Sequence, residues 1–423
     1  MGGTAFARSR EFRLAVFQCD VTPEIGGPLF NGVMARSIIG PLLANGVVLI
    51  EEKPIAVIVS VDWCEIRNGA YDHWRTELGR AAGVSRERVL LSCVHQHDAP
   101  YVDTDALQTP FHQHTVANVA AALKNSLAKT RRITHVGTGQ GKVESVASNR
   151  RYLTADGKVS YGRTSATRDA FVRNQPEGLI DPFLKTISFW DDDTAVAALS
   201  CYSTHPMSYY GKGDVSSDFV GMARTQRQKE TPAVAQIYFS GASGDTMAGR
   251  YNDGDPANRA SLASRMHQGM LDAWRDTKRH PLGKIGFRSV PLRLEPRKTK
   301  GFSAADFRAV LARPDAPFRE RNEASLGLNW LARIKQPIDV PAIDLGPAQI
   351  ILLPAESFVQ YQLWAQQKRP DQMVMTLGFG ECAPGYIPTA KDAADGYDDH
   401  YSWIAFPECE APIRKAIDAA LTK

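Results

Sequence analysis

Two histidines separated by one residue directly follow an apolar run. The run Val89–Val94 predicts a strand, and His95 and His97 come immediately after it. Side chains two positions apart on a strand point to the same side, so both imidazoles would face one point. Such a pair suits two neighbouring metal ligands, or one ligand beside a group that moves protons. An ordinary pair of surface histidines fits the same pattern.

A second pair with the same spacing, His112 and His114, lies near the start of a predicted helix. Residues two positions apart on a helix point in different directions. We therefore expect these two histidines to be solvated.

Two further strand-like runs lead to side chains that can bind a metal. Ala195–Cys201 leads to His205, and Ile350–Leu353 leads to Glu356. Sites in open α/β sheets lie at the carboxyl ends of strands. Taken singly, His205 fits a core histidine whose hydrogen bonds are satisfied, and Glu356 fits an acidic residue at the start of a helix. Together with His95 and His97, they indicate a metal site.

The strand-like run Val234–Phe239 enters a turn rich in glycine and serine, which contains Gly244 and Asp245. Backbone N–H groups in such turns hold anions, and we assign this turn to substrate binding. The turn is not a phosphate-binding P-loop, because the Lys-Ser/Thr ending is missing. A tight structural turn explains the same residues.

Strand-like and helical patterns alternate along the chain, which predicts an α/β protein with a mixed-sheet core. Without a repeat or a flexible linker, we expect a single catalytic domain over residues 1–423. The expected strands are Arg13–Cys19, Val47–Glu51, Ala56–Val61, Val89–Val94, Thr134–Gly137, Thr186–Trp190, Ala195–Cys201, Val234–Phe239, Ile285–Leu292 and Ala348–Leu353. The expected helices are Tyr71–Ala82, Thr115–Ala128, Phe219–Glu230, Ala257–Thr277, Ala304–Ala312, Ala324–Lys335 and Glu410–Leu421, with a capping box at Ser303 and Asp306.

The composition is that of an ordinary globular protein, with 43% hydrophobic and 23% charged residues and a net charge of +4. No basic block favours a nucleic-acid partner. No window approaches the roughly 18–20 apolar residues of a membrane span, so we expect no integral membrane segment. The oligomeric state stays open.

The compartment also stays open. The N-terminus lacks a hydrophobic signal core, which indicates a cytoplasmic protein. If a signal peptide has been removed and residues 1–3 are additions, the protein is periplasmic or secreted. The six cysteines form no CxxC motif, and whether Cys382 and Cys409 pair depends on that compartment.

Taken in order, these segments resemble the catalytic domain of the neutral/alkaline non-lysosomal ceramidases. Asp20-Val-Thr-Pro resembles the opening motif of that family, and Val94-His-Gln-His-Asp-Ala-Pro100 is similar to its Thr-His-Thr-His-Ser-Gly-Pro motif. The later matches are Asn149-Arg150, Ser203-Thr-His-Pro-Met207 with Val215–Gly221, Leu353-Pro-Ala-Glu356, and Gly385-Tyr-Ile-Pro-Thr389 with Tyr397.

The resemblance implies a zinc-dependent hydrolase and assigns its residues. Zinc lowers the pKa of its bound water and polarises the substrate, while a nearby imidazole or phenol moves the proton. The implied zinc ligands are His95, His205, Glu356 and Tyr386. The implied contacts with the scissile group come from His97, Arg150 and Tyr397.

Two departures from the family pattern bear on mechanism and substrate. The position of the family's serine falls on Met247, followed by Ala248 instead of proline. A thioether cannot act as a hydrolytic nucleophile, so we expect a mechanism without an acyl-serine. We also expect the family's C-terminal immunoglobulin-like domain to be absent. A substrate smaller or more polar than long-chain ceramide follows from this expectation.

The predicted function is therefore a zinc-dependent amidohydrolase that cleaves an N-acyl bond of a small polar or lipid-like molecule with a metal-activated water. The alternative is a carbohydrate-active enzyme on the same scaffold, either a glycoside hydrolase or a uronic-acid lyase that acts on an oligosaccharide. Arginine and aromatic residues that suit a sugar carboxylate are Arg150, Arg151, Tyr152, Tyr161, Arg163, Tyr209, Tyr210 and Trp330. A binding protein without activity is a third hypothesis, which the retention of all four ligand positions opposes.

Overall fold

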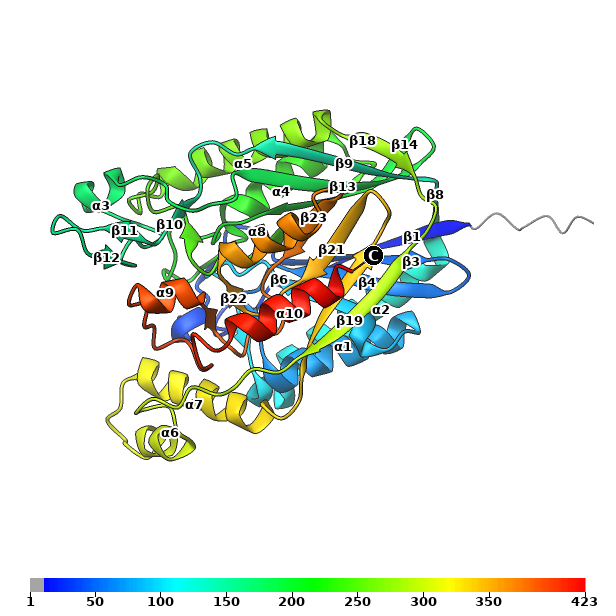
Figure 1. Ribbon diagram of the computed structural model, residues 1–423. Coiled ribbons are helices and arrows are strands. Elements are labelled where there is room, and N and C mark those ends of the chain that lie inside the picture. The colour runs from blue at the N-terminus through cyan, green and yellow to red at the C-terminus, as the bar shows by residue number, and fades with distance from the viewer. Residues whose placement is uncertain (1–10, 423) are drawn as a thin grey trace, which may run out of the picture.

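The computed structural model describes residues 11–422, and three large β-sheets form its centre (Figure 1). The strand order is β6-β4-β3-β1-β8 in the first sheet, β16-β14-β13-β9-β18 in the second and β19-β20-β21-β23 in the third. The strands of the first sheet are β1 (Phe12–Asp20), β3 (Leu43–Ile50), β4 (Pro54–Val61), β6 (Val89–Cys93) and β8 (Arg131–Ile133). Those of the second are β9 (His135–Lys142), β13 (Phe183–Asp191), β14 (Thr194–Tyr202), β16 (Ala235–Ser240) and β18 (Lys278–Pro281). Those of the third are β19 (Gly286–Leu292), β20 (Ile338–Asp344), β21 (Ala348–Leu352) and β23 (Met373–Leu377).

Each sheet is antiparallel except for one parallel pair at an edge. These pairs are β4 with β6, β14 with β16, and β21 with β23. A helix connects the two strands of each pair, as a parallel connection requires. The connecting helices are α1 (Asn68–Ala82), α4 (Asp218–Glu230) and α8 (Val359–Lys368). The prediction of a mixed-sheet α/β fold is confirmed.

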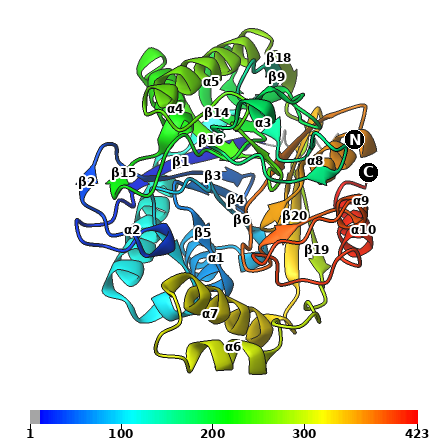
Figure 2. The same cartoon turned by 90° about the vertical axis from the view of Figure 1, so that its left-hand side faces the viewer.

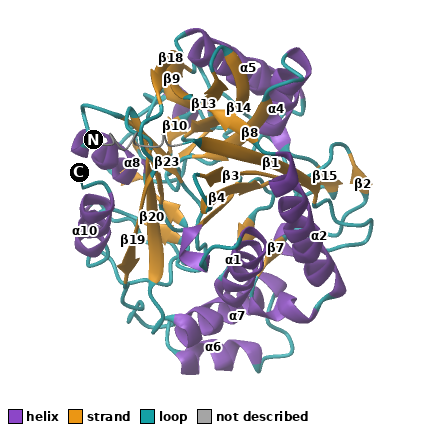
Figure 3. Cartoon of the chain, turned by 90° about the vertical axis from the view of Figure 1, so that its right-hand side faces the viewer, coloured by secondary structure: helices purple, strands orange, loops and turns teal. Residues whose placement is uncertain are grey.

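The three sheets share one hydrophobic core. Leu14 of the first sheet, Ile187 of the second and Ile350 of the third all belong to it. Side chains alternate along each strand, so the next residue faces away: Ala15 packs in a separate cluster with α1 and α2 (Pro110–Ser126). Figure 3 shows α1 and α2 beside the first sheet, α4 and α5 (Ala257–Arg275) beside the second, and α10 (Glu410–Ala420) beside the third.

The remaining helices surround the end of the molecule that holds the candidate site. Figure 2 shows α6 (Ala304–Leu311) and α7 (Phe318–Arg333) together, away from the second sheet. The expected capping box is present, because Ser303 and Asp306 exchange hydrogen bonds at the start of α6. These helices are α3 (Ala170–Asn174), α6 (Ala304–Leu311), α7 (Phe318–Arg333) and α9 (Ala390–Ala394).

The three sheets meet through backbone hydrogen bonds at one point. The Cys93 N–H donates to the Phe379 carbonyl at 3.0 Å, and the Gly378 N–H donates to the Ser240 carbonyl at 2.8 Å. Gly378 is required here, because a Cβ at this position would lie 2.5 Å from the Gly241 carbonyl oxygen. The ends of β6, β16 and β23 are therefore held together beside the site.

Three expectations need correction or extension. His112 was predicted to be solvated, but it is buried in α2, with its ring 5.6 Å from that of His73 and 6.5 Å from that of Trp74. The prediction was wrong because α2 begins at Pro110, which turns His112 towards α1 and leaves His114 exposed. The strands β20 and β23 and the helix α8 were not predicted, and α7 begins at Phe318 instead of Ala324.

Two further findings concern the chain as a whole. None of the helices within residues 11–422 is both long and apolar enough to cross a bilayer. Cys382 and Cys409 are both free thiols in this structure, and they lie in different hydrophobic clusters. Residues 1–3, which enter the expectation about the compartment, lie outside the described part. The single domain over residues 1–423 stays a prediction.

Candidate metal centre

Each of the three large sheets contributes one residue to a common cluster. His95 follows β6, His205 follows β14 and Glu356 follows β21. The side chains of these three residues are buried, and their ligand atoms lie within 4.8 Å of one another. The structure therefore brings three of the four predicted ligands together in one cluster.

The spacing of the atoms suits a tetrahedral metal ion. The Glu356 Oε2 atom lies 2.9 Å from His205 Nε2 and 3.5 Å from His95 Nε2. Zinc ligands at about 2.0–2.1 Å from a tetrahedral ion lie about 3.3–3.4 Å apart. Two imidazoles and a carboxylate are also the donor set that zinc accepts. These residues therefore fit a zinc ion.

Backbone carbonyls fix the orientation of both imidazoles. Nδ1 of His95 donates a hydrogen bond to the Cys64 carbonyl at 3.0 Å, and Nδ1 of His205 donates to the Ser243 carbonyl at 2.7 Å. Each bond places the proton on Nδ1 and leaves Nε2 to bind a metal, the usual arrangement of metal-binding histidines.

The backbone at the site adopts an uncommon conformation. His95 has φ of 67°, Ala355 48° and Phe379 52°, all in the left-handed region. Residues other than glycine adopt this region at a cost in free energy, and residues strained in this way are often found at functional sites. The strand β6 has already ended at Cys93, so the predicted strand alternation does not explain how His95 and His97 converge. A turn brings them together, with their Nε2 atoms 3.4 Å apart.

The fourth predicted ligand, Tyr386, is placed by a short parallel strand pair. Glu356 in β22 (Glu356–Ser357) is the partner of Tyr386 in β24 (Tyr386–Ile387). Paired residues in neighbouring strands project to the same face, and both side chains line the same cavity. The ring centroid of Tyr386 lies 6.5 Å from that of His205. Tyr386 as a ligand stays a prediction.

The cluster strongly perturbs the charges of its members. Burial opposes the charged form of Glu356, but the two histidines outweigh burial and hold the pKa of this carboxyl well below its usual value. Burial also favours neutral His95, yet the carboxylate of Glu356 raises the pKa of this imidazole. Burial lowers the pKa of His205. A carboxylate that stays ionised in a buried site is ready to bind a cation.

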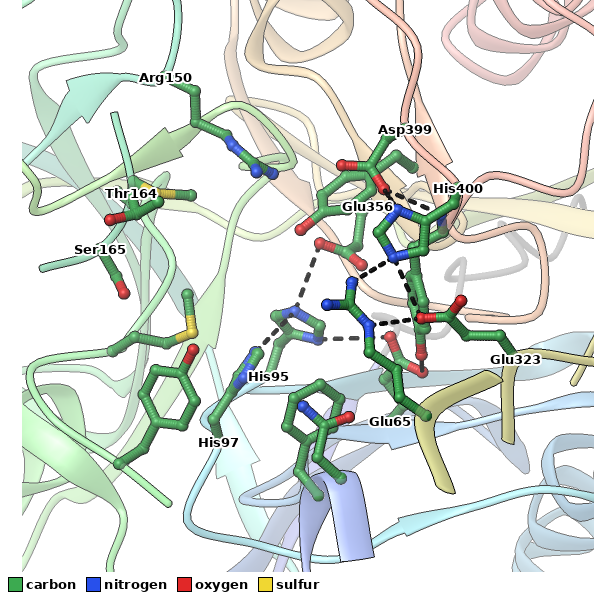
Figure 4. Close-up of a pocket in the computed structure, with 18 of the residues that line it drawn as sticks. Glu65, His95, His97, Arg150, Thr164, Ser165, Glu323, Glu356, Asp399 and His400 are labelled. Atoms are coloured by element: carbon green, nitrogen blue, oxygen red, sulfur yellow. Dashed lines mark hydrogen bonds and ion pairs between the residues drawn. The ribbon is translucent and has the colours of Figure 1, made fainter. Parts of the chain in front are cut away.

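His97 and Arg150 line the cavity beside the cluster (Figure 4). Burial, together with the charges of His95 and His205, lowers the pKa of His97 well below its ordinary value. His97 is therefore neutral near pH 7 and able to accept a proton. The Nε and Nη1 atoms of Arg150 have no hydrogen-bond partner within residues 11–422, and the guanidinium lies 5.0 Å from the centre of the Tyr386 ring.

The other predicted site residues lie behind the cavity wall. Tyr397 is 4% exposed and does not line the cavity, and its hydroxyl has no hydrogen-bond partner among the described residues. Gly244 and Asp245 do not line it either. Asp245 accepts hydrogen bonds from Asn149 at 2.6 Å and from the backbone of Val359 at 2.7 Å.

Gly244 and Asp245 instead support the residues that do line the cavity. The Gly244 N–H donates to the Ser357 carbonyl at 3.0 Å, and a Cβ on Gly244 would lie 2.1 Å from the Glu356 carbonyl oxygen. The Asp245 carbonyl accepts the N–H of Arg150 at 2.7 Å. Both residues therefore help to place Glu356 and Arg150. Substrate binding by this turn stays a prediction, and neither Gly244 nor Asp245 lines the cavity.

Met247 lines the cavity at the place where the resembled family has its serine. Its backbone pairs with that of His205 in a parallel bridge, which holds the thioether next to the cluster. The nearby Ser240 and Ser243 do not line the cavity. Their hydroxyls donate to the carbonyls of Val94 at 2.7 Å and Gly241 at 3.1 Å.

The opposite wall of the cavity was not predicted from the sequence. It comes from α7, from the loop after α9, and from Glu65 after β4. The polar positions of α7 are spaced by three and four residues, which places them on one helix face. Glu65 follows a strand as Glu356 does, so the same signal was available for it. The polar residues of this wall are Glu65, Arg319, Asn322, Glu323, Asp399, His400 and Tyr401.

Few of the arginine and aromatic residues proposed for a sugar carboxylate reach the cavity. Arg150 and Tyr210 line it. Arg151 instead pairs with Asp395 at 2.8 Å, and Trp330 is buried in the cluster between the third sheet and its helices. Thr164 and Ser165, which were not predicted, line the same side of the cavity as Arg150 (Figure 4).

Comparison with known proteins supports the fold assignment. No family model and no curated protein matches the sequence. Among solved structures, neutral ceramidase from Pseudomonas aeruginosa aligns with a TM-score of 0.71 over 97% of this chain and 74% of its own, at 16% sequence identity. A ceramidase complexed with C2 aligns with the same score, coverage and identity. Nothing in these comparisons supports the carbohydrate-active alternative. The chain has the fold of neutral ceramidase.

Proposed function

We propose that this protein is a zinc-dependent hydrolase that cleaves the amide bond of a small, polar N-acyl compound. The observation that carries the proposal is the convergence of His95, His205 and Glu356 from three sheets in one buried cluster. The shared fold with proteins named as ceramidases supports a hydrolase of this type. A zinc ion bound there would supply a Lewis acid and a water of lowered pKa.

The residues around the cluster divide the remaining work. Neutral His97, whose Nε2 lies 3.4 Å from that of His95, accepts a proton from the attacking water and returns it to the leaving amine. Arg150 directs its unpaired Nε and Nη1 groups to the negative charge that develops on the amide oxygen. Tyr386 completes the ligand set next to Glu356, and Tyr397 supports Arg150 and Tyr386 from behind.

The mechanism requires no serine nucleophile. Met247 has no proton to lose and no oxygen to attack with, and the hydroxyls of Ser240 and Ser243 are bonded to carbonyls outside the cavity. Ser165 lines the cavity on the side of Arg150, so it is the serine whose labelling would contradict this route.

The size of the cavity favours a small substrate. Its volume is about 250 Å³, whereas sites for drug-sized ligands occupy roughly 300–1,000 Å³. Most of the lining residues have charged or polar side chains, and Phe30, Met207 and Met247 are the main apolar ones. A short N-acyl group on a polar amine fits this lining better than a long lipid.

The test is metal analysis of the purified protein combined with an assay of short N-acyl amides. We expect bound zinc, release of the carboxylic acid detected by mass spectrometry, loss of activity with a chelator and recovery with added zinc. Sulfonyl fluorides should leave the activity unchanged. Full zinc content in both His205→Ala and Glu356→Ala variants, or a covalent adduct on Ser165, Ser240 or Ser243, would contradict the proposal.

A further inference from the structure

Glu65 occupies in the first sheet the place that two proposed metal ligands occupy in the other sheets. Each sheet contains a strand, a connecting helix and a parallel strand: β4-α1-β6, β14-α4-β16 and β21-α8-β23. Glu65, His205 and Glu356 each lie after the first strand of such a unit and before its helix. The fold therefore directs the Glu65 side chain to the same end of the molecule as the two ligands.

One carboxylate oxygen of Glu65 is fully engaged by the protein. Oε2 accepts hydrogen bonds from Arg67 Nη1 at 2.7 Å and from the Tyr401 hydroxyl at 2.9 Å. Arg67 is itself buried and donates to the Ala383 carbonyl at 2.9 Å. The position of the Glu65 carboxylate is thus fixed, and its charge is compensated on one side.

The other oxygen, Oε1, has no hydrogen-bond partner within residues 11–422, although Glu65 is 0% exposed. Nδ1 of His95 lies 3.9 Å from Oε1, beyond hydrogen-bond distance. That nitrogen already donates to the Cys64 carbonyl at 3.0 Å. A buried acceptor without a partner costs free energy unless a ligand supplies the donor.

Glu65 lines the cavity on the side away from Arg150. Figure 4 shows Glu65 and Glu323 on one side of His95, with Arg150 on the other. Asn322 and Asp399 line the cavity as well and add further polar atoms. The wall opposite Arg150 therefore offers acceptors at Glu65, Asn322 and Asp399, next to the ion pair of Arg319 with Glu323 at 2.8 Å.

We infer that Glu65 is a specificity residue that accepts a hydrogen bond from a hydroxyl or ammonium group of the substrate, on the amine portion next to the scissile amide. This inference rests on the proposed function and names its substrate class: N-acyl amines that carry a hydrogen-bond donor. A site built to bond a polar group discriminates strongly against an analogue that lacks it, because the buried acceptor is then left unpaired.

Three probes with the same acyl group and the same length isolate the effect of the hydrogen-bond donor on hydrolysis. N-hexanoylethanolamine carries a hydroxyl, N-hexanoylethylenediamine carries an ammonium and N-hexanoylpropylamine carries a methyl at that place. For the zinc-loaded protein we expect kcat/KM at least about 10-fold higher for one or both donor probes than for the propylamide. The better donor probe identifies the group as hydroxyl or ammonium.

The variant Glu65→Gln removes the acceptor and keeps the shape. The amide oxygen of glutamine takes the bonds from Arg67 and Tyr401, so the NH₂ group faces the cavity and the preference for donors disappears. Glu65→Asp keeps the charge opposite Arg67 but moves the carboxylate oxygen away from the substrate. If Glu65→Gln does not fold, Glu65→Asp replaces it in the test and should weaken the preference for donor probes. Glu381→Gln is the matched control, since Glu381 is a buried carboxylate 3.2 Å from Arg333 that does not line the cavity, and it should keep the preference.

Zinc content distinguishes this role from one that acts through His95. A carboxylate that only orients a ligand histidine affects metal affinity about 10- to 100-fold. If Glu65→Gln loses zinc and slows all three probes by the same factor, the inference is wrong. It is also wrong if the wild-type protein hydrolyses the three probes equally.

The inference can be separated from the proposed function by measuring binding. If no probe is hydrolysed, ligand-observed NMR on the zinc-loaded protein still compares their affinities. A preference for donor probes that is lost in Glu65→Gln would support the subsite while the hydrolase proposal fails. No such preference in binding would overturn the subsite.

Discussion

His97 combines a neutral imidazole with a position next to the proposed metal ligand His95. Burial and the nearby histidines keep the pKa of His97 well below the ordinary value, so at neutral pH the ring is uncharged and one ring nitrogen can accept a proton. The Nδ1 atom of His97 has no hydrogen-bond partner within the described residues, so no contact in the protein holds this nitrogen in one protonation state. A general base needs this protonation state.

Replacing His97 by alanine should therefore leave the zinc content unchanged and lower kcat by about 100-fold or more. Zinc is measured by mass spectrometry of the protein, and kcat with the best short N-acyl amide. His114→Ala is the control, because His114 has the same spacing in its pair but is exposed on α2. Loss of zinc from His97→Ala would make His97 a ligand and overturn this role.

The two tyrosines should respond differently to the loss of a hydroxyl. Tyr386→Phe removes a proposed zinc ligand, so we expect reduced zinc content as well as reduced activity. Tyr397→Phe should keep zinc and most of the activity, because the Tyr397 hydroxyl lies behind the cavity wall and has no hydrogen-bond partner within the described residues. A loss of turnover of about 100-fold, the typical cost of a lost transition-state hydrogen bond, would show instead that this hydroxyl reaches the scissile group.

The packing of α2 against α1 depends on a buried, neutral histidine. His112 lies between these helices, and neither of its ring nitrogens has a hydrogen-bond partner within the described residues. Burial lowers the pKa of His112 from 6.5 to about 4. His112 takes up a proton below pH 6.5 in the unfolded chain, but only below about pH 4 in the folded protein.

The free energy of unfolding should therefore fall as the pH is lowered through this window, by up to about 1.4 kcal/mol per pH unit from this group. His112→Phe keeps a ring in the same space and cannot take up a proton. We expect its unfolding temperature to fall less than that of the wild type between pH 6.5 and about 4. His114→Phe on the exposed face of α2 should follow the wild type. Equal slopes for all three proteins would contradict the prediction.

At the scale of the whole molecule, the three sheets depend on their junction beside the site. Gly378→Ala places a Cβ 2.5 Å from the Gly241 carbonyl oxygen, and neither backbone can move without breaking the bonds between β6, β16 and β23. We expect a loss of about 2 kcal/mol or more in the free energy of unfolding, measured with urea. Gly283→Ala is the control, because nothing lies within 4 Å of its added Cβ. A Gly378→Ala protein as stable as this control would show that the junction accommodates the added Cβ without losing its hydrogen bonds.

Zinc should link the stability of the three sheets, because its proposed ligands come from all of them. A ligand that binds only the folded state stabilises it by about 2.7 kcal/mol at a concentration of 100 times its Kd. We expect the unfolding temperature of chelated protein to rise when zinc is added. His205→Ala should show a much smaller rise, and a rise equal to that of the wild type would mean that zinc binds elsewhere.

Much of the fold was predictable because it depends on local patterns. The short apolar runs in β1, β14 and β21 predict strands, and the 3.6-residue period of α4 and α5 predicts helices. The strand β20 was missed because Pro341 interrupts its pattern. A proline is tolerated there because Pro341 lies outside the part of β20 that pairs with β21, so this position has a strand on one side only. The helix α8 was missed because its glutamines and aromatic residues give a weak period.

The sequence by itself determined which residues are candidates for a metal site, since side-chain chemistry and a position after a strand are local properties. His95, His205 and Glu356 became candidates in this way, and the resemblance to the ceramidases added their assignment to zinc. The tertiary structure alone decided which of the polar residues meet. His95 and His97 converge through a left-handed turn, Tyr397 and Asp245 lie behind the wall, and Glu65 faces the cavity. Contacts between three sheets depend on packing across hundreds of residues, which no local pattern encodes.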